Sequence, residues 1–121
     1  MKYILSLVIL SSTILALDVD GVWKEVSTDK HRESVIVMAR DGDTIRVTCC
    51  WYKDNLKVVW YGIGKVNNEQ IRYEIVHTTA PSDFDKRGVH DLKLDDNGMR
   101  MTGTWTNSRM ESGKLEFVRV K

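Results

Sequence analysis

The sequence alternates between short segments rich in β-branched and aromatic residues and short clusters of turn-forming residues. Such segments predict β-strands, and after residue 17 the sequence has no extended run with a helical apolar period. The predicted strands cover residues 21–26, 34–40, 44–52, 56–64, 69–78, 89–94, 99–106 and 114–120. Because eight strands of similar length follow one another, we predict an all-β fold: a single antiparallel up-and-down eight-stranded barrel.

Turn residues and the alternation within strands agree with this fold. Asp41-Gly42 and Asn97-Gly98 are dipeptides that favour tight hairpin turns. Every second side chain of a strand points to the same face, so the apolar set of each strand is expected to fill the interior. This predicted interior includes Ile45, Val47, Cys49, Trp51, Ile71, Tyr73, Ile75, His77, His90, Leu92, Leu94, Met99, Met101, Gly103, Trp105, Leu115 and Phe117. Arg119 also falls on the inward side of the last strand.

The first sixteen residues have the pattern of a secretory signal peptide. Met1-Lys2 gives a positive start, an apolar stretch follows, and Ala16 ends a tolerable cleavage site. An uncleaved anchor is the alternative, but the apolar run is short for a spanning helix. We therefore expect a signal peptide at 1–16, one barrel domain over 17–121, a secreted or periplasmic location and no stable membrane anchor.

The charges do not point to a polyanionic partner. The chain has 18 Lys and Arg against 17 Asp and Glu, and they form no block of one sign. The largest basic cluster, Lys86-Arg87, lies beside Asp83 and Asp85. We therefore expect no nucleic-acid partner.

The two cysteines, Cys49 and Cys50, are neighbours in a predicted strand. Neighbours in a strand point to opposite faces, so a regular strand cannot join them. We predict that Cys49 is buried, that Cys50 is exposed and that they are not bonded to each other. A strained disulfide at a bulge, or a bridge from Cys50 to a second chain, are the alternatives.

Two histidines are the best candidates for polar chemistry. His77 ends one predicted strand and His90 lies in the next. If their hairpin is symmetric about residues 83–84, the two side chains face each other near one rim. With Asp83 or Asp91 they could hold a polar group, but two histidines alone make a poor metal site. We therefore predict no metal and no cofactor.

Enzyme motifs give no competing indication. The sequence has no Ser-His-Asp order, no Gly-x-Ser-x-Gly elbow and no phosphate-binding glycine loop. We expect a protein that is not an enzyme. A hydrolase or isomerase that uses His77 and His90 is the alternative.

Inward aromatic residues indicate a ligand pocket at one end of the barrel. Gly62, Gly64 and Gly103 lie on the same faces, and because glycine has no side chain they would leave part of the interior unfilled. The longest connection, residues 79–88, would cover that end. The predicted ligand-binding residues are Trp51, Trp60, Tyr73, Ile75, His77, His90, Met101 and Trp105, with both histidines at the rim. A solidly packed interior is the alternative.

Short motifs at both ends of the predicted barrel resemble the calycin superfamily, which includes the lipocalins, fatty-acid-binding proteins and avidins. Gly21-Val22-Trp23 opens the first strand as a Gly-x-Trp does in those families, and the strand order resembles their meander. The pattern of Gly103-Thr104-Trp105 and Phe117-Val118-Arg119 is similar to that of small secreted bacterial barrels of unassigned function. The resemblance implies that Arg119 packs across Trp23 and closes the base. The biotin-binding residues of avidins have no match here.

Fold and resemblance together lead to one functional expectation. We expect a secreted, non-enzymatic binding protein that holds a small apolar or amphipathic ligand in a β-barrel. The alternative is a protein-interaction or inhibitor module that acts through its loops, so a protein partner stays open.

Overall fold

A computed structural model describes residues 18–27, 33–53 and 55–120, and the predicted signal peptide at 1–16 lies outside them. The described residues form eight strands. They are β1 (Gly21–Glu25), β2 (Glu33–Asp41), β3 (Thr44–Lys53), β4 (Leu56–Asn67), β5 (Gln70–Thr79), β6 (Arg87–Leu94), β7 (Arg100–Asn107) and β8 (Ser112–Arg119). None of these residues forms a helix of the length and apolar character that crossing a membrane requires.

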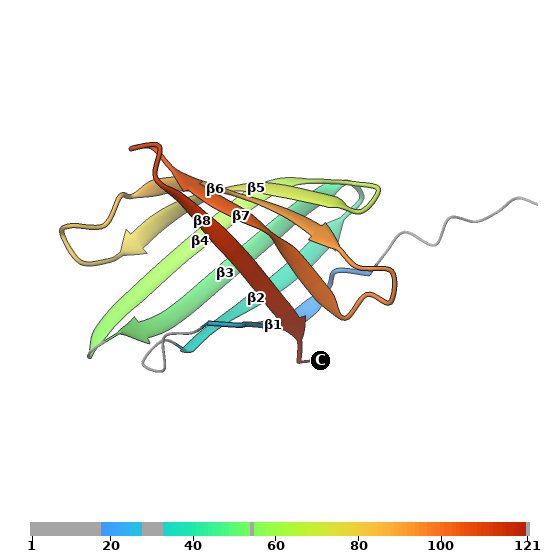
Figure 1. Cartoon of the computed structure of the whole chain (residues 1–121), viewed down its shortest axis with the longest axis horizontal. Helices are drawn as coiled ribbons and strands as arrows, with labels where there is room; N and C mark the ends of the chain where they lie inside the picture. Colours follow the sequence, from blue (N-terminus) through green and yellow to red (C-terminus); the bar gives the residue numbers. More distant parts are fainter. Residues whose placement is uncertain (1–17, 28–32, 54, 121) are drawn as a thin grey trace, which may run out of the picture.

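The strands close into a barrel in chain order (Figure 1). Each strand pairs antiparallel with the next, and β8 returns to pair with β1 through Trp23 and Arg119, Lys24 and Val118, and Glu25 and Phe117. The prediction of an all-β, up-and-down, eight-stranded barrel is confirmed. In a closed barrel each strand has a neighbour on both sides, and β1 and β8 meet over three residue pairs.

The largest difference in strand length concerns β4, which continues to Asn67 instead of stopping near Gly64. Gly62 and Gly64 pair in register with Ile75 and Tyr73 of β5, so they lie inside the ladder. These glycines allow the backbone of β5 to approach β4 closely. A Cβ on Gly64 would lie 1.9 Å from the carbonyl oxygen of Arg72. Glycine there admits the neighbouring backbone.

The apolar residues predicted to face inward are all buried or partly buried, with one exception. The exception is Met99, which is 51% exposed. The N–H of Met99 donates to Oδ1 of Asp95 and to Oδ1 of Asn97, at 3.0 and 3.1 Å. Met99 therefore belongs to the β6–β7 turn, and strand alternation does not apply to it.

One end of the barrel is closed by Trp23 and Arg119, as expected. The Arg119 guanidinium lies 4.3 Å from the centre of the Trp23 ring. It also donates hydrogen bonds to the carbonyl oxygens of Gly98 (3.0 Å), Asp20 (2.8 Å) and Asp18. Arg119 thus joins the last strand to the β6–β7 turn and to the segment that precedes β1.

Neither cysteine is in a disulfide; Cys49 is buried and Cys50 is exposed, as predicted. The Sγ atom of Cys49 lies 3.4 Å from Oγ of Ser34, another buried residue. The alternative of a disulfide between neighbours is wrong, because the regular ladder turns the two side chains to opposite faces.

The first prediction concerns the closed end. Arg119→Met keeps an apolar stem over Trp23 but removes the cation and its hydrogen bonds. We expect the free energy of unfolding to fall by about 2 kcal/mol, within the range for charged hydrogen bonds and cation–π contacts. Urea denaturation measures this change. The control, Arg72→Met, breaks an exposed ion pair with Asp91 and should cost less than about 1 kcal/mol; equal losses would contradict the prediction.

The second prediction concerns the thiols. In the native protein a thiol reagent should modify one cysteine quickly, Cys50, and the second only after unfolding. Cys50→Ser should abolish the fast phase, whereas Cys49→Ala should leave it intact. Two fast-reacting groups would show that Cys49 is not protected.

Candidate functional site

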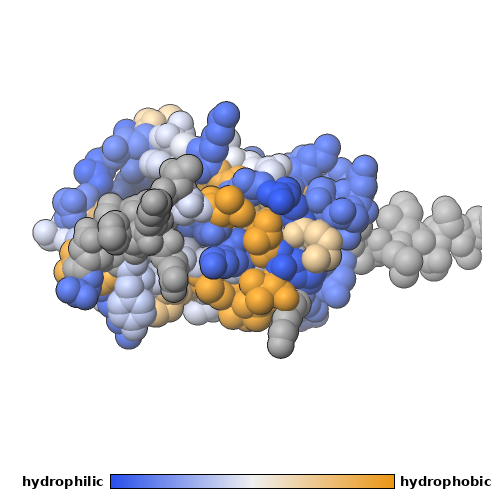
Figure 2. Space-filling view, turned by 60° about the horizontal axis from the view of Figure 1, so that its bottom comes forward, coloured by the Kyte–Doolittle hydropathy of each residue, from blue (hydrophilic) through white to orange (hydrophobic). Residues whose placement is uncertain are grey.

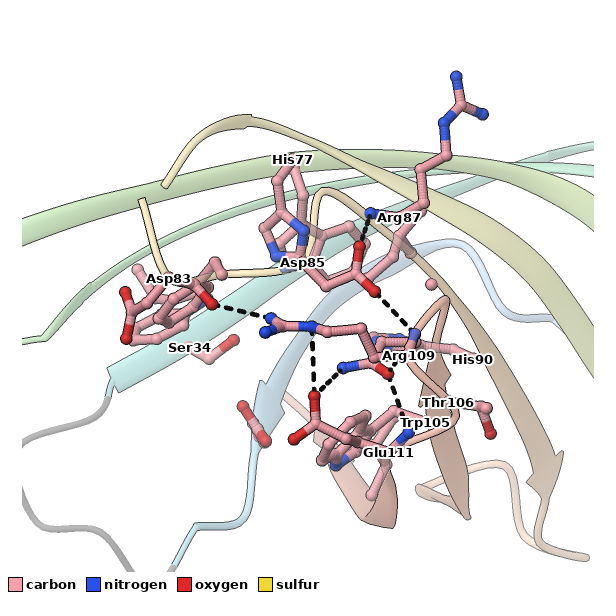
Figure 3. A pocket seen from close by; sticks show the side chains of 18 of the residues that line it. Ser34, His77, Asp83, Asp85, Arg87, His90, Trp105, Thr106, Arg109 and Glu111 are labelled. Carbon is pink, nitrogen blue, oxygen red and sulfur yellow. Dashed lines mark hydrogen bonds and ion pairs between the residues drawn. The ribbon is translucent and has the colours of Figure 1, made fainter. Parts of the chain in front are cut away.

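The interior of the barrel is packed at the Trp23 end and hollow at the other end. The hollow end holds a cavity of about 350 Å³ (Figure 3). That volume equals the share of about a dozen water molecules in the liquid. The cavity is lined by Glu25, Ser34, Trp51, Trp60, Ile75, His77, Asp83, Phe84, Asp85, Arg87, Gly88, His90, Trp105, Thr106, Asn107, Arg109, Glu111, Leu115 and Phe117.

Aromatic side chains from several strands form part of the walls, among polar and charged ones. Trp51 of β3 and Trp60 of β4 are each 4% exposed, and Phe117 of β8 is buried. Trp105 of β7 is partly buried and packs against this core. Trp105 pairs in register with Gly113 of β8, where an added Cβ would lie 2.5 Å from the indole Nε1. The missing side chain of Gly113 therefore lets the Trp105 indole lie against β8.

The floor of the cavity is a buried polar pair. The hydroxyl of Tyr73 and Nδ1 of His90 are 2.8 Å apart. Burial, followed by the nearby charges of Cys49 and Glu25, holds the pKa of Tyr73 well above its usual value, so the phenol stays protonated. When the phenol donates to Nδ1, the proton of a neutral His90 ring is on Nε2. The Trp60 ring lies edge-on to His90, with centres 5.1 Å apart.

His77 lies near the mouth of the cavity. Its ring is edge-on to Phe84, with centres 6.0 Å apart, and its buried Nδ1 has no hydrogen-bond partner. Desolvation lowers the pKa of His77, while hydrogen bonding to Lys86 and the charge of Asp85 partly oppose that shift. His77 is therefore neutral at pH 7.

The expectation that His77 and His90 face each other is wrong. In the β5–β6 ladder His90 pairs with Tyr73, and the N–H of His77 donates to the carbonyl oxygen of Lys86 at 2.8 Å. The hairpin is not symmetric about residues 83–84, because β6 begins at Arg87 rather than at residue 89. As a result, His90 lies deep in the barrel and only His77 lies near the rim.

Six of the eight residues named from the sequence line the cavity. These six are Trp51, Trp60, Ile75, His77, His90 and Trp105. Tyr73 lies just beneath the lining, where its hydroxyl holds His90. Met101 is fully buried among apolar residues, outside the lining.

The glycines that suggested missing volume do not create the cavity. Gly62, Gly64 and Gly103 are absent from its lining. A Cβ on Gly103 would lie 1.9 Å from the carbonyl oxygen of Asp91, so neighbouring backbone already occupies that space. The inference of a hollow end agrees with the structure, but its glycine argument is wrong.

Two loops meet over the cavity: residues 80–86 between β5 and β6, and residues 108–111 between β7 and β8 (Figure 3). The Asp85 carboxylate accepts hydrogen bonds from the Ser108 hydroxyl and from the N–H of Arg109. The Arg109 guanidinium donates to the Asp83 carbonyl oxygen at 2.8 Å and pairs with Glu111 at 3.4 Å. Hydrogen bonding, first of all from Ser108, lowers the pKa of Asp85, so it stays ionised.

Several lining residues are absent from the sequence-based site. Glu25 and Ser34 share the inward alternation of Trp23 and Ile36, so their strand positions carried a usable signal. Asp85 and Arg109 are in loops, where alternation assigns no face. Their meeting follows only from how the two loops fold over the barrel.

The cavity combines aromatic side chains, the Tyr73–His90 pair beneath and beside them, and charged residues at its mouth. Among the described residues, no three His, Cys, Asp or Glu side chains are placed to hold a metal ion.

The third prediction follows from the neutral state of His77. The folded pKa lies below the ordinary 6.5, so the unfolded chain takes up a proton first as the pH falls. The stability contributed by neutral His77 is therefore complete above about pH 6.5 and is lost below it. His77→Gln should show a smaller loss of stability than the wild type between pH 7.5 and 5.5, measured by urea denaturation. Identical losses would contradict the prediction.

Comparisons with known proteins do not place the chain in a family. No protein-family model matches it, and neither a curated protein nor a solved structure is significantly similar to it. Its function is therefore inferred from its fold and its cavity.

Proposed function

We propose that this protein is a secreted binding protein that holds a small apolar or amphipathic ligand in the hollow end of its barrel. The observation that carries the proposal is the contrast between the two ends. Trp23 and Arg119 close a packed end, whereas the other end holds a cavity of about 350 Å³ with aromatic walls. Pockets of this size and composition are typical of small-molecule sites.

The energetics favour such a role. Burial of apolar ligand surface contributes roughly 25 cal/mol per Å², and the walls supply that surface without a change in the barrel. A polar group of the ligand would remain near the mouth, where Asp85, Arg109 and Glu111 gather.

Secretion and kinship with the calycins are parts of the proposal. The apolar stretch after Met1-Lys2 supports secretion. The up-and-down barrel and the contact between Trp23 and Arg119 support a calycin-like protein.

We propose a binding protein rather than an enzyme. The alternative, an enzyme that uses His77 and His90, requires a cavity that holds both histidines, and both line this one. We favour a binding protein because the β5–β6 register does not pair the two histidines, and because His90 is held by Tyr73.

The fourth prediction tests ligand binding. N-phenyl-1-naphthylamine, a neutral apolar probe, should quench tryptophan emission and fluoresce in its bound state. Trp60→Ala should weaken probe binding about tenfold, the effect of losing roughly 60 Å² of apolar contact. Tyr61→Ala, which changes the neighbouring outward-facing residue, should leave binding unchanged. Trp105→Leu should also weaken binding and serves if Trp60→Ala does not fold. Failure of both this three-ring probe and the smaller 2-naphthol to bind the wild type would refute the proposal.

A protein-interaction module is the second candidate, and one observation favours it. Apolar side chains gather between charged ones on the face that lies at the bottom of Figure 1, as Figure 2 shows. The exposed apolar residues of β2 and β4 include Val35, Val37, Tyr61 and Ile63. Exposed apolar side chains that cluster can mark a protein contact.

A further inference from the structure

We propose that the ligand of the cavity is a planar aromatic compound of one or two rings, with its polar group at the mouth, rather than a long-chain lipid. The inference rests on the proposed binding function and names the class of ligand. Three independent features carry it: the position of the rings around the barrel, the depth of the cavity, and the loops that cover it.

The rings come from opposite walls. In the closed order of eight strands, β3 and β7 are four strands apart, and so are β4 and β8. Trp51 and Trp105 therefore approach the cavity from opposing sides, as do Trp60 and Phe117. A flat ring between such walls contacts aromatic surface on both of its faces, and stacked or edge-to-face contacts add to plain apolar burial.

The wall rings are already held in place. Trp60 is stacked on Tyr73, with an angle of 19° between the ring planes and 6.1 Å between their centres. Trp51 packs against Phe84 at 6.0 Å, and Trp105 lies against Gly113. Because these contacts within the protein already hold the rings, binding a flat ligand costs little ordering of side chains.

The cavity is small for a long chain. His90, held by Tyr73, lies deep in it, and the apolar core that reaches Trp23 lies beyond. Its volume of about 350 Å³ is at the lower end of the range for small-molecule pockets. A fused two-ring compound with one polar substituent needs less of that space than a long acyl chain.

The cover over the cavity also favours a compact ligand. Phe84, from the β5–β6 loop, contacts both Trp51 and His77. The hydrogen bonds from Arg109 to Asp83 and Asp85 keep that loop against the β7–β8 loop. A long tail would have to pass between these loops, whereas a ring compound fits beneath them.

A matched series of ten-carbon alcohols tests the inference. 2-Naphthol, decahydro-2-naphthol and 1-decanol share the carbon count and the hydroxyl, and differ in aromaticity and shape. By titration calorimetry at pH 7.5 we expect 2-naphthol to bind about fivefold more tightly than either saturated alcohol. This order is the reverse of what hydrophobicity alone predicts, because 2-naphthol is the least apolar of the three.

Two variants test whether the preference for 2-naphthol comes from the aromatic side chains that line the cavity. Trp105→Leu keeps an apolar side chain but removes a ring, so the preference for 2-naphthol over decahydro-2-naphthol should disappear. Tyr61→Leu removes a ring from the outer face and should leave that preference unchanged.

The outcomes separate this inference from the proposed function. If a saturated alcohol binds as tightly as 2-naphthol or more tightly, the aromatic inference is wrong and a general apolar pocket stands. If Tyr61→Leu removes the preference as Trp105→Leu does, the preference does not come from the cavity walls and the inference is again wrong. If none of the three alcohols binds and N-phenyl-1-naphthylamine also fails to bind, both proposals fall.

Discussion

Pairing of β8 with β1 is the constraint on which the rest of this structure depends. The pairing is short, because β1 has only five residues, yet it converts an eight-stranded meander into a closed barrel. Arg119 reinforces the seam from inside by covering Trp23 and by donating to backbone carbonyl oxygens of Asp18 and Asp20. Once the sheet is closed, the number of strands sets the interior width, and inward side chains must fill that width or leave it empty.

The two ends of the barrel use this fixed interior differently. At the Trp23 end the inward apolar side chains are buried and belong to one hydrophobic cluster. At the other end some inward positions carry polar residues, namely Glu25, Ser34 and His90, and the tryptophans stand along the wall. The space left between opposite walls is covered by Phe84 and by loops that hold each other through Asp85 and Arg109. The result is a cavity at one end of the barrel, with two joined loops at its mouth.

Local alternation accounts for what could be predicted about the fold. It assigned the strands, the buried Cys49, the exposed Cys50 and most of the core, because a strand has a side-chain period of two whatever its partners are. It failed at Met99, where backbone N–H groups bond to turn side chains and the strand has not yet begun. The prediction was also wrong about Gly64 and Gly103. The space beside them is occupied by the backbone of a neighbouring strand, which the local sequence around each glycine does not show.

The candidate site shows where sequence reasoning ends. Alternation along the strands was enough to predict that Trp51, Trp60 and Trp105 share one interior. Tertiary structure alone decided the depth at which each one lies, since a shift of the hairpin register by an even number of residues moves a side chain along the barrel and keeps it on the same face. That is why His90 lies on the floor beside Tyr73 while His77 remains near the mouth. The loop contacts were likewise decided only in three dimensions, because no periodic rule links Asp85 to Ser108 and Arg109, which are more than twenty residues away in the chain.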